Sequence, residues 1–247
     1  MMQFMLFRSH QSWRYLFQAL WLLIFAALLL AGAPMQLWWG LLFAALASTL
    51  LLKRAACSFA CPLFALGELL WRSGARRLGR NVTPPFWFDL PLRTAKYLLL
   101  GWMLAALLRG EPAAAFPSVS GAVIISCAAA LLILSLFLQM PWCRYLCPCG
   151  ALLGLVSVAS LLKIRRTPRH CVRCHRCDSR CPANLPVMFG TSVHSAECFA
   201  CSRCVDGCPA PGALAFASSG NRAIPAWRTG LWLTLLLLLG LGFSAVY

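Results

Sequence analysis

Two cysteine runs in the last third of the chain have the same spacing, C-x2-C-x2-C-x3-C-P. Two-residue gaps allow three thiolates from one tight loop to reach three corners of a cubane iron–sulfur cluster. The fourth thiolate, next to the proline, normally crosses to the other cluster. The spacing therefore predicts a module that holds two such clusters. The runs are Cys171, Cys174, Cys177 and Cys181, and Cys198, Cys201, Cys204 and Cys208.

This spacing is the signature of a two-cluster bacterial ferredoxin module, an α+β fold. Structural zinc is the alternative, because C-x2-C pairs also form tetrahedral zinc sites, but two complete quartets favour iron and sulfide. Disulfides are disfavoured, since cysteines this dense on a reducing side of a membrane favour metal or redox chemistry. With the crossover, one 4Fe-4S cluster is assigned to Cys171, Cys174, Cys177 and Cys208, and the second to Cys198, Cys201, Cys204 and Cys181.

Most of the remaining chain is apolar, with 61% hydrophobic and 11% charged residues over 247 positions, which predicts an integral membrane protein. Candidate spans approach the length of about 20 apolar residues that a bilayer requires. The candidate span Leu92–Leu108 is the weakest, because its Arg93 and Lys96 must extend toward lipid headgroups. The expected fold is an all-α bundle of about five spans: Trp13–Gly32, Met35–Leu52, Leu92–Leu108, Val119–Met140 and Arg228–Tyr247.

The division into domains follows from these segments. We expect a membrane domain over residues 1–164, a ferredoxin-like domain over 165–222 and a C-terminal transmembrane helix over 223–247. Two shorter apolar pieces, Pro62–Trp71 and Ala151–Leu162, are too short to span comfortably and are interpreted as interfacial or re-entrant helices.

Lysine and arginine placement predicts the orientation. With the N-terminus in the cytoplasm, 21 of the 22 basic residues lie inside and Arg109 alone lies outside. This puts the ferredoxin module in the cytoplasm and the C-terminus in the periplasm of a multi-pass protein of the bacterial inner membrane. The net charge of +16 is then explained by topology, and no nucleic-acid partner is expected.

The membrane part also contains a weak duplication. A C-x3-C-P element follows the second span as Cys57 and Cys61, and another follows the fourth span as Cys143 and Cys147. Each is followed by a short apolar helix and a basic run, which indicates a repeated unit of two spans and a cysteine turn. Residues i and i+4 share a helical face, so each pair can present two thiols together. The four thiols are interpreted as a site for a further metal or cluster, as redox-active dithiols, or as small packing residues.

The sequences around these cysteines resemble one family over most of the chain, from about Trp13 to Pro209. Lys53-Arg-Ala-Ala-Cys57, Trp142-Cys143-Arg-Tyr-Leu-Cys147 and the double cysteine run occur in the order found in NapH-type and MauN-type membrane ferredoxin proteins, which are related to the membrane half of NosR-type proteins. The resemblance implies a quinol dehydrogenase membrane subunit. Such a subunit passes electrons from membrane quinol to a redox partner protein of a respiratory, nitrate or methylamine pathway.

A quinol site needs a proton acceptor near the interface. Glu68 is the leading candidate, because it interrupts the apolar helix after the first C-x3-C-P element, and an ionisable group there is a functional candidate. His170, His175 and Asp89 are the others. The arginines of the ferredoxin module can raise the cluster potentials, remain solvated, or form a docking face for an acidic partner.

Two other functions compete with quinol oxidation. One is a metal-handling or assembly-factor reductase, in which the C-x3-C-P thiols hold a metal ion while the clusters supply electrons. The other is a regulatory iron–sulfur sensor of redox state without steady turnover. Clusters that quinol reduces in purified protein favour the dehydrogenase.

Overall fold

A computed structural model describes residues 10–78, 85–110, 126, 130–131, 133–218 and 222–246 of the chain. The structure is mainly helical, with one small sheet. Its elements are α2 (His10–Leu30), α3 (Met35–Leu52), α4 (Ala55–Phe59), α5 (Pro62–Leu78), α6 (Phe86–Leu108), η1 (Trp142–Leu146), α9 (Pro148–Ser157), β1 (Lys163–Arg166), η2 (Pro168–His170), α10 (Arg176–Ser179), α11 (Arg203–Asp206), β2 (Leu214–Ala217) and α12 (Ala226–Val246).

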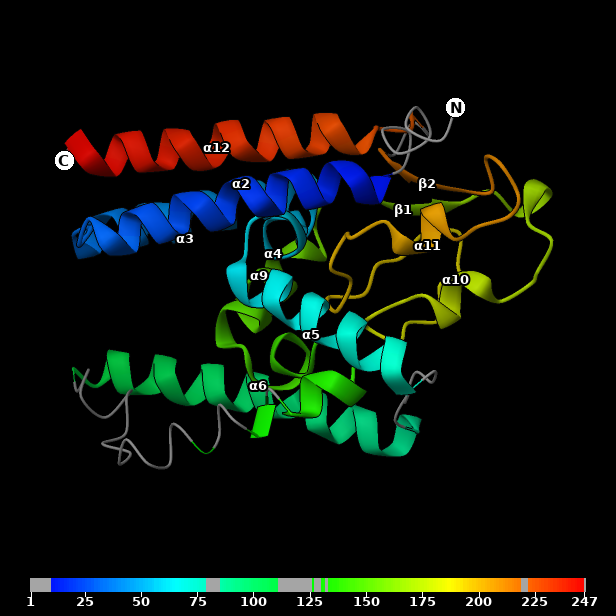
Figure 1. The fold of residues 1–247 in the computed structure, drawn as a ribbon, viewed down its shortest axis with the longest axis horizontal. Helices are drawn as coiled ribbons and strands as arrows, with labels where there is room; N and C mark the ends of the chain where they lie inside the picture. The colour runs from blue at the N-terminus through cyan, green and yellow to red at the C-terminus, as the bar shows by residue number, and fades with distance from the viewer. Residues whose placement is uncertain are drawn as a thin grey trace. The chain divides into compact units, whose positions relative to one another are not determined.

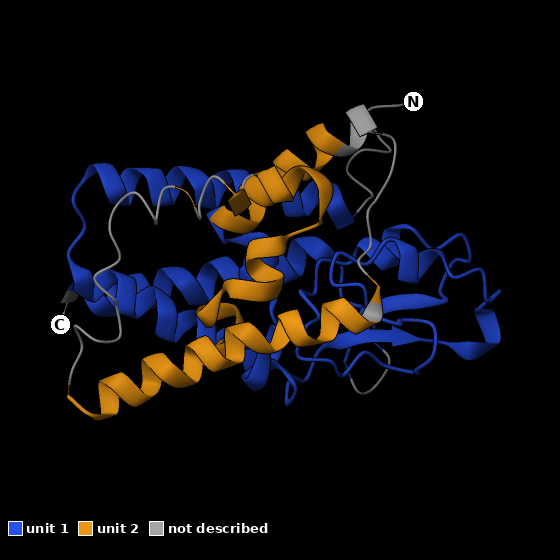
Figure 2. Cartoon of the chain, turned by 90° about the horizontal axis from the view of Figure 1, so that it is seen from below, with its two compact units in different colours: residues 1–62, 153–247 blue, residues 63–152 orange. Residues whose placement is uncertain are grey.

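The chain divides into two compact units (Figure 2). The first unit comprises residues 1–62 and 153–247, and the second comprises residues 63–152. The first unit thus combines α2, α3, α4 and α12 with the whole cysteine-rich module. The first C-x3-C-P pair, Cys57 and Cys61, belongs to this unit, whereas Cys143 and Cys147 belong to the second.

Three described helices, α2, α3 and α12, are long and apolar enough to cross a membrane. All three belong to the first unit, where α12 contacts both α2 and α3 (Figure 1). Their outward faces expose large apolar side chains such as Leu30, Phe43 and Leu239. Exposed apolar faces on this scale suit a lipid environment. The predicted bounds of these spans are confirmed to within three residues.

The contact between α3 and α12 depends on small residues. A Cβ atom added at Gly40 would lie 2.3 Å from Ser244 Oγ, and one added at Gly240 would lie 2.5 Å from the Cβ of Ala44. Gly40 and Ala44, like Gly240 and Ser244, are four residues apart and therefore share a helix face. This is the small-xxx-small arrangement that lets transmembrane helices approach closely.

We expect Gly240→Ala to lower the stability of the first unit by about 1–3 kcal/mol, because the added methyl group overpacks the contact. Gly242→Ala on the same helix is the matched control, since its added Cβ meets nothing within 4 Å. Both substitutions change helix propensity alike, so the difference between their thermal unfolding midpoints in detergent isolates the clash. Equal midpoints would mean that the close contact between α3 and α12 does not limit the stability of the first unit.

The cysteine-rich module is built around an antiparallel pair of short strands. Lys163 of β1 pairs with Ala217 of β2, and Arg166 pairs with Leu214. The two cysteine runs lie between these strands in the sequence, and each run contains one four-residue helix, α10 or α11. The core beneath includes Ile164 and Phe216, which are almost fully buried. The module is therefore α+β, as predicted.

The second unit contains α5, α6 and η1. The predicted span Leu92–Leu108 forms part of α6, which starts earlier, at Phe86, and is not among the three helices that meet the length and apolarity required for a span. The expectation that Lys96 extends to headgroups is wrong, because this side chain is fully buried and its ammonium lies 5.2 Å from the ring centre of Tyr97. Half of the predicted span Val119–Met140 lies outside the described residues.

Candidate iron–sulfur sites

The first candidate site is a cavity lined by four thiols. Cys171, Cys174 and Cys177 from the first run line it together with Cys208 from the end of the second run. Arg166, His175, Met188 and Leu214 complete much of the wall. These four cysteines are the quartet that the crossover assignment puts together.

The second candidate site contains the other quartet. Cys198, Cys201 and Cys204 from the second run line a cavity with Cys181 from the end of the first run. Its remaining walls are largely apolar, with Ile164, Leu185, Val187 and Phe199. Each cavity thus receives three thiols from one loop and one from the other.

The backbone of the two loops follows the same path. Arg173 and His175 in the first loop adopt left-handed conformations, and so do Ala200 and Ser202 at the matching positions of the second loop. His175 and Ser202 each directly precede a four-residue helix. Because these turns direct successive N–H groups inward, they make a concave surface that suits an anionic cluster.

Backbone N–H groups also point at the thiols. The N–H of Arg173 hydrogen-bonds the sulfur of Cys171 and, with the Arg166 side chain, holds the pKa of that thiol below its usual value. Burial, together with the nearby Cys198 and Cys201, raises the pKa of Cys181 to about 12. Metal ligands must be deprotonated, so a buried thiol quartet requires the positive charge of bound metal ions.

The geometry fits a cluster better than one ion. Among the described residues, no group of three or more His, Cys, Asp or Glu side chains converges closely enough to hold a single metal ion. A structural zinc would draw four sulfurs to about 2.3 Å. Each quartet instead surrounds a cavity, as expected when four thiolates bind four different irons of a cubane.

The second loop and the segment just before it are attached to the helices of the first unit by buried cations. Arg54, fully buried, donates a hydrogen bond to the carbonyl of Ala196 at 2.9 Å, and its guanidinium lies 4.8 Å from the ring centre of Phe199. Lys53, also fully buried, donates to the carbonyl of Val193 at 3.2 Å. Sequence reasoning found these two residues only as part of a motif, because their partners lie about 140 positions away.

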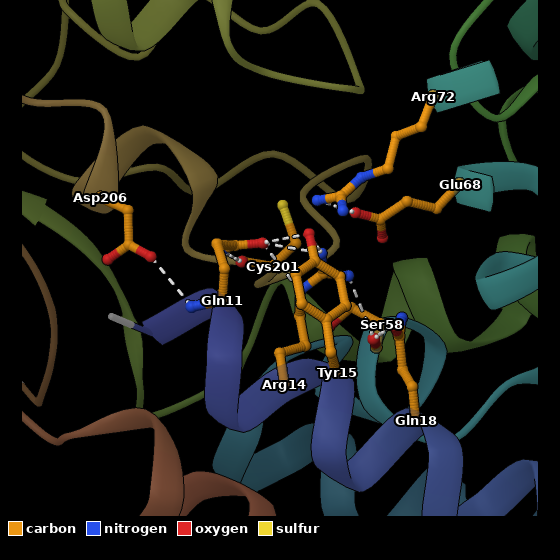
Figure 3. Close-up of polar contacts among 9 residues, drawn as sticks. All are labelled: Gln11, Arg14, Tyr15, Gln18, Ser58, Glu68, Arg72, Cys201 and Asp206. Carbon is orange, nitrogen blue, oxygen red and sulfur yellow. Dashed lines mark hydrogen bonds and ion pairs between the residues drawn. The ribbon is translucent and has the colours of Figure 1, made fainter. Parts of the chain in front are cut away.

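The start of α2 contacts the same loop (Figure 3). Gln11 Nε2 donates to the carbonyl of Cys201 at 2.7 Å, and the backbone N–H of Gln11 donates to the Asp206 carboxylate at 2.9 Å. A carboxylate at a helix N-terminus satisfies unpaired N–H groups and complements the helix dipole. The first span and the second loop therefore hold each other in place.

The first C-x3-C-P turn lies beside α2. Gln18, which is buried, donates to the carbonyl of Ser58 at 2.7 Å, between Cys57 and Cys61 (Figure 3). The helix α4 ends at Phe59 and α5 begins at Pro62, so Cys61 lies between two helices. The predicted common helical face is therefore interrupted, because a residue before proline is pushed away from helical geometry.

The second C-x3-C-P turn is held by a buried carboxylate. Asp89 on α6 forms an ion pair with Arg144, another with Arg93, and accepts a hydrogen bond from the hydroxyl of Tyr145 at 2.8 Å. Arg144 and Tyr145 belong to the π-helical turn η1 that joins Cys143 to Cys147. Asp89 was predicted as one of several proton acceptors, whereas the structure shows it anchoring this turn.

Cys147 directly precedes α9. Its sulfur accepts a hydrogen bond from the N–H of Gly150 at 3.2 Å, and Pro148 is the first residue of the helix. A thiol at this position is a helix cap, and the N–H group favours its thiolate form. The second cysteine of each C-x3-C-P element thus precedes a helix that begins with proline.

Glu68 is buried within the second unit and forms an ion pair with Arg72 at 3.4 Å. A cavity of about 250 Å³ lies beside α5, and Gly67, the neighbour of Glu68, is among its lining residues together with Trp142 and Cys143. The lining is mostly apolar, and Glu68 does not belong to it. The predicted acceptor therefore lies near this cavity and not in its wall.

Comparisons with known proteins also indicate iron–sulfur chemistry. The family model described as "4Fe-4S binding domain" matches residues 34–81 and 120–167, so that each match includes one C-x3-C-P pair and neither includes the two long cysteine runs. No solved structure matches the chain. The two matches thus identify the chain as an iron–sulfur protein.

Curated relatives define the family. "Putative electron transport protein YccM" of Escherichia coli K12 is 38% identical over 83% of this chain and 63% of its own length. "Methylamine utilization ferredoxin-type protein MauN" of Paracoccus denitrificans is 33% identical over 52% of this chain and 48% of its own. "Ferredoxin-type protein NapH" of E. coli K12 is 31% identical over 53% of this chain and 48% of its own length. Together these similarities support a NapH/MauN-type ferredoxin protein, and the chain spans about half to somewhat under two thirds of the length of these relatives.

Proposed function

We propose that the chain carries electrons from membrane quinol to a redox partner protein through two 4Fe-4S clusters. The observation that carries this proposal is the pair of cavities, each lined by an interleaved cysteine quartet, in a module joined to three apolar helices. When bound, the clusters would accept and release single electrons. The thiols of the chain would hold them, and the backbone N–H groups of the two loops would stabilise their negative charge.

The module is proposed to face the cytoplasm of a bacterial inner membrane. The start of α2, the end of α3 and the segment before α12 all meet the module, through Gln11, Lys53 and a backbone hydrogen bond from Ile224 to Phe216. These helix ends therefore share one side of the membrane. The excess of basic residues in the connecting segments favours the cytoplasmic side.

The C-x3-C-P thiols are proposed to bind a further metal or cluster. Both pairs lie within segments that match the 4Fe-4S binding domain. The helix cap at Cys147 supports this proposal, because it favours the thiolate that metal binding requires. The same observations are compatible with metal handling, so this role is the second candidate function of the chain.

Glu68 is proposed to accept a proton when quinol is oxidised. In Glu68→Gln, we expect the rate at which quinol reduces the clusters to fall by about 10²–10⁴-fold, as for the loss of a general base. Dithionite reduces clusters without quinol chemistry, so dithionite reduction and both EPR signals should be unchanged. The measurement is stopped-flow absorbance of full-length protein in nanodiscs with a soluble quinol analogue.

Two outcomes distinguish an error in the role of Glu68 from an error in the proposed quinol oxidation. If Glu68→Gln reduces its clusters with quinol as fast as the parent protein, another group accepts the proton. If the parent protein itself contains clusters that dithionite reduces and quinol does not, quinol oxidation is the wrong function. The sensor or metal-handling alternatives would then replace it.

A further inference from the structure

The two cluster-binding loops share one backbone path but have opposite surroundings. The first loop, Cys171–Cys177, exposes all five residues between its outer cysteines. In the second loop, Cys198–Cys204, the four matching residues Phe199–Ser202 are buried and Arg203 is half-buried. Since the local sequences have the same spacing, the difference comes from what covers each loop.

The membrane-helix part of the first unit covers the second loop from one side, and residues of the module such as Leu185 and Val187 line the same cavity as Phe199. Gln11 of α2 binds the carbonyl of Cys201, and the Arg54 guanidinium lies against Phe199. Phe199 is only 2% exposed. The helix α11 of the second run contacts α2, whereas α10 of the first run lies farther from the three apolar helices (Figure 1).

The first loop instead presents an apolar and basic surface. Val172 is 65% exposed and Phe189 is 75% exposed, and the ring of Phe189 lies 6.1 Å from that of His175. Cys174, a thiol of the first quartet, is exposed beside Val172. The exposed side chains around them include four arginines, Arg169, Arg173, Arg176 and Arg180.

The acidic residue of this loop region is already engaged. Asp178 pairs with His175 at 3.0 Å and accepts the N–H of Met188 at 3.0 Å. The surface therefore presents mainly positive charge around exposed apolar groups. Apolar centres with charged rims are typical of protein docking sites, and a positive rim favours a partner with a negatively charged surface.

We propose that the first-loop surface is the docking site for an acidic one-electron carrier protein, and that the second cluster lies on the membrane side of the relay. This inference rests on the proposed function. It adds the class of the redox partner and the direction in which electrons pass between the two clusters. In the transfer, one electron leaves the reduced first cluster and reduces the carrier by one electron. The first cluster would give up the electron alone, and any proton that the reduced carrier takes up comes from solvent.

Anionic lipid headgroups could also attract four arginines. The observations favour a protein, because the exposed apolar side chains flank a cluster thiol and the loop belongs to the part of the unit that lies farthest from α2, α3 and α12 (Figure 1). Basic residues that bind headgroups normally lie next to the spans. The charge here is instead centred on the site where an electron would leave.

The test uses full-length, cluster-loaded protein in nanodiscs and an acidic flavodoxin as the probe. Stopped-flow mixing of the reduced protein with oxidised flavodoxin measures the second-order rate constant of electron transfer. This constant should fall as ionic strength rises, and Arg176→Glu or Arg169→Glu should lower it about tenfold or more. Arg222→Glu, at an exposed position before α12, makes the same charge change and should leave the constant unaltered.

Iron content and EPR spectra of each variant establish that both clusters are present. Equal rate constants in Arg176→Glu, Arg169→Glu and Arg222→Glu would overturn the docking site. A rate that follows the anionic lipid content of the nanodisc, and not the two arginines, would assign the surface to the membrane and overturn it too. Quinol reduction is measured in the same samples, so a failure of the proposed function is seen separately.

Discussion

Replacing Cys171 and Cys208 together by alanine is expected to remove one iron–sulfur cluster, whereas replacing Cys198 and Cys208 together should remove both. The reason is the interleaving of the quartets, since Cys208 lines the cavity of the first loop and not that of its own run. Once Cys208 is absent, the further loss of Cys171 affects a cluster that has already been lost. Each single replacement should remove one cluster.

Iron analysis and EPR of anaerobically purified protein provide the measurement. The parent module should contain about eight irons per chain, the first double variant about four and the second close to none. Cys149→Ala is the control, because this exposed cysteine lies outside both quartets. Reversed results for the double variants would mean that each run binds its own cluster. A parent content near twelve would point to a further cluster at the C-x3-C-P thiols.

Spacing along the chain predicted the local parts of this site well. The gaps of two residues specify how each loop turns, and the structure shows matching left-handed residues in both loops. The apolar runs predicted α2, α3 and α12 because span length depends on composition alone. The crossover was predicted from a motif, and the structure shows both mixed quartets lining their cavities.

The contacts that hold the site in place could not be read in the same way. Lys53 and Arg54 reach carbonyl groups that follow them by more than 130 positions, and carbonyl acceptors leave no trace in residue identity. The burial difference between the two loops is hidden for the same reason. Asp89 was predicted only as a candidate proton acceptor, because its partners Arg144 and Tyr145 follow it by more than 50 positions, on the π-helical turn η1.

Asp89→Ala is expected to destabilise the second unit by about 3–5 kcal/mol, the usual effect of removing one partner from a buried ion pair. Asp89 and Arg144 are both nearly fully buried, and Arg93 shares the same carboxylate. Without it, two guanidinium groups lose the carboxylate that they share, and that of Arg144 is nearly fully buried. The turn between Cys143 and Cys147 should become disordered, which alkylation of these thiols in detergent would detect together with a lower unfolding midpoint.

Tyr145→Phe provides a graded comparison within the same network. It removes one hydrogen bond to a charged group, for which about 1.5–3 kcal/mol is usual, and leaves both ion pairs intact. Thiol reactivity at Cys143 and Cys147 should therefore rise less than in Asp89→Ala, while Cys57 and Cys61 in the other unit should keep their rates in both variants. If all four thiols react alike in Asp89→Ala, the carboxylate stabilises the protein as a whole and does not specifically hold the second cysteine turn.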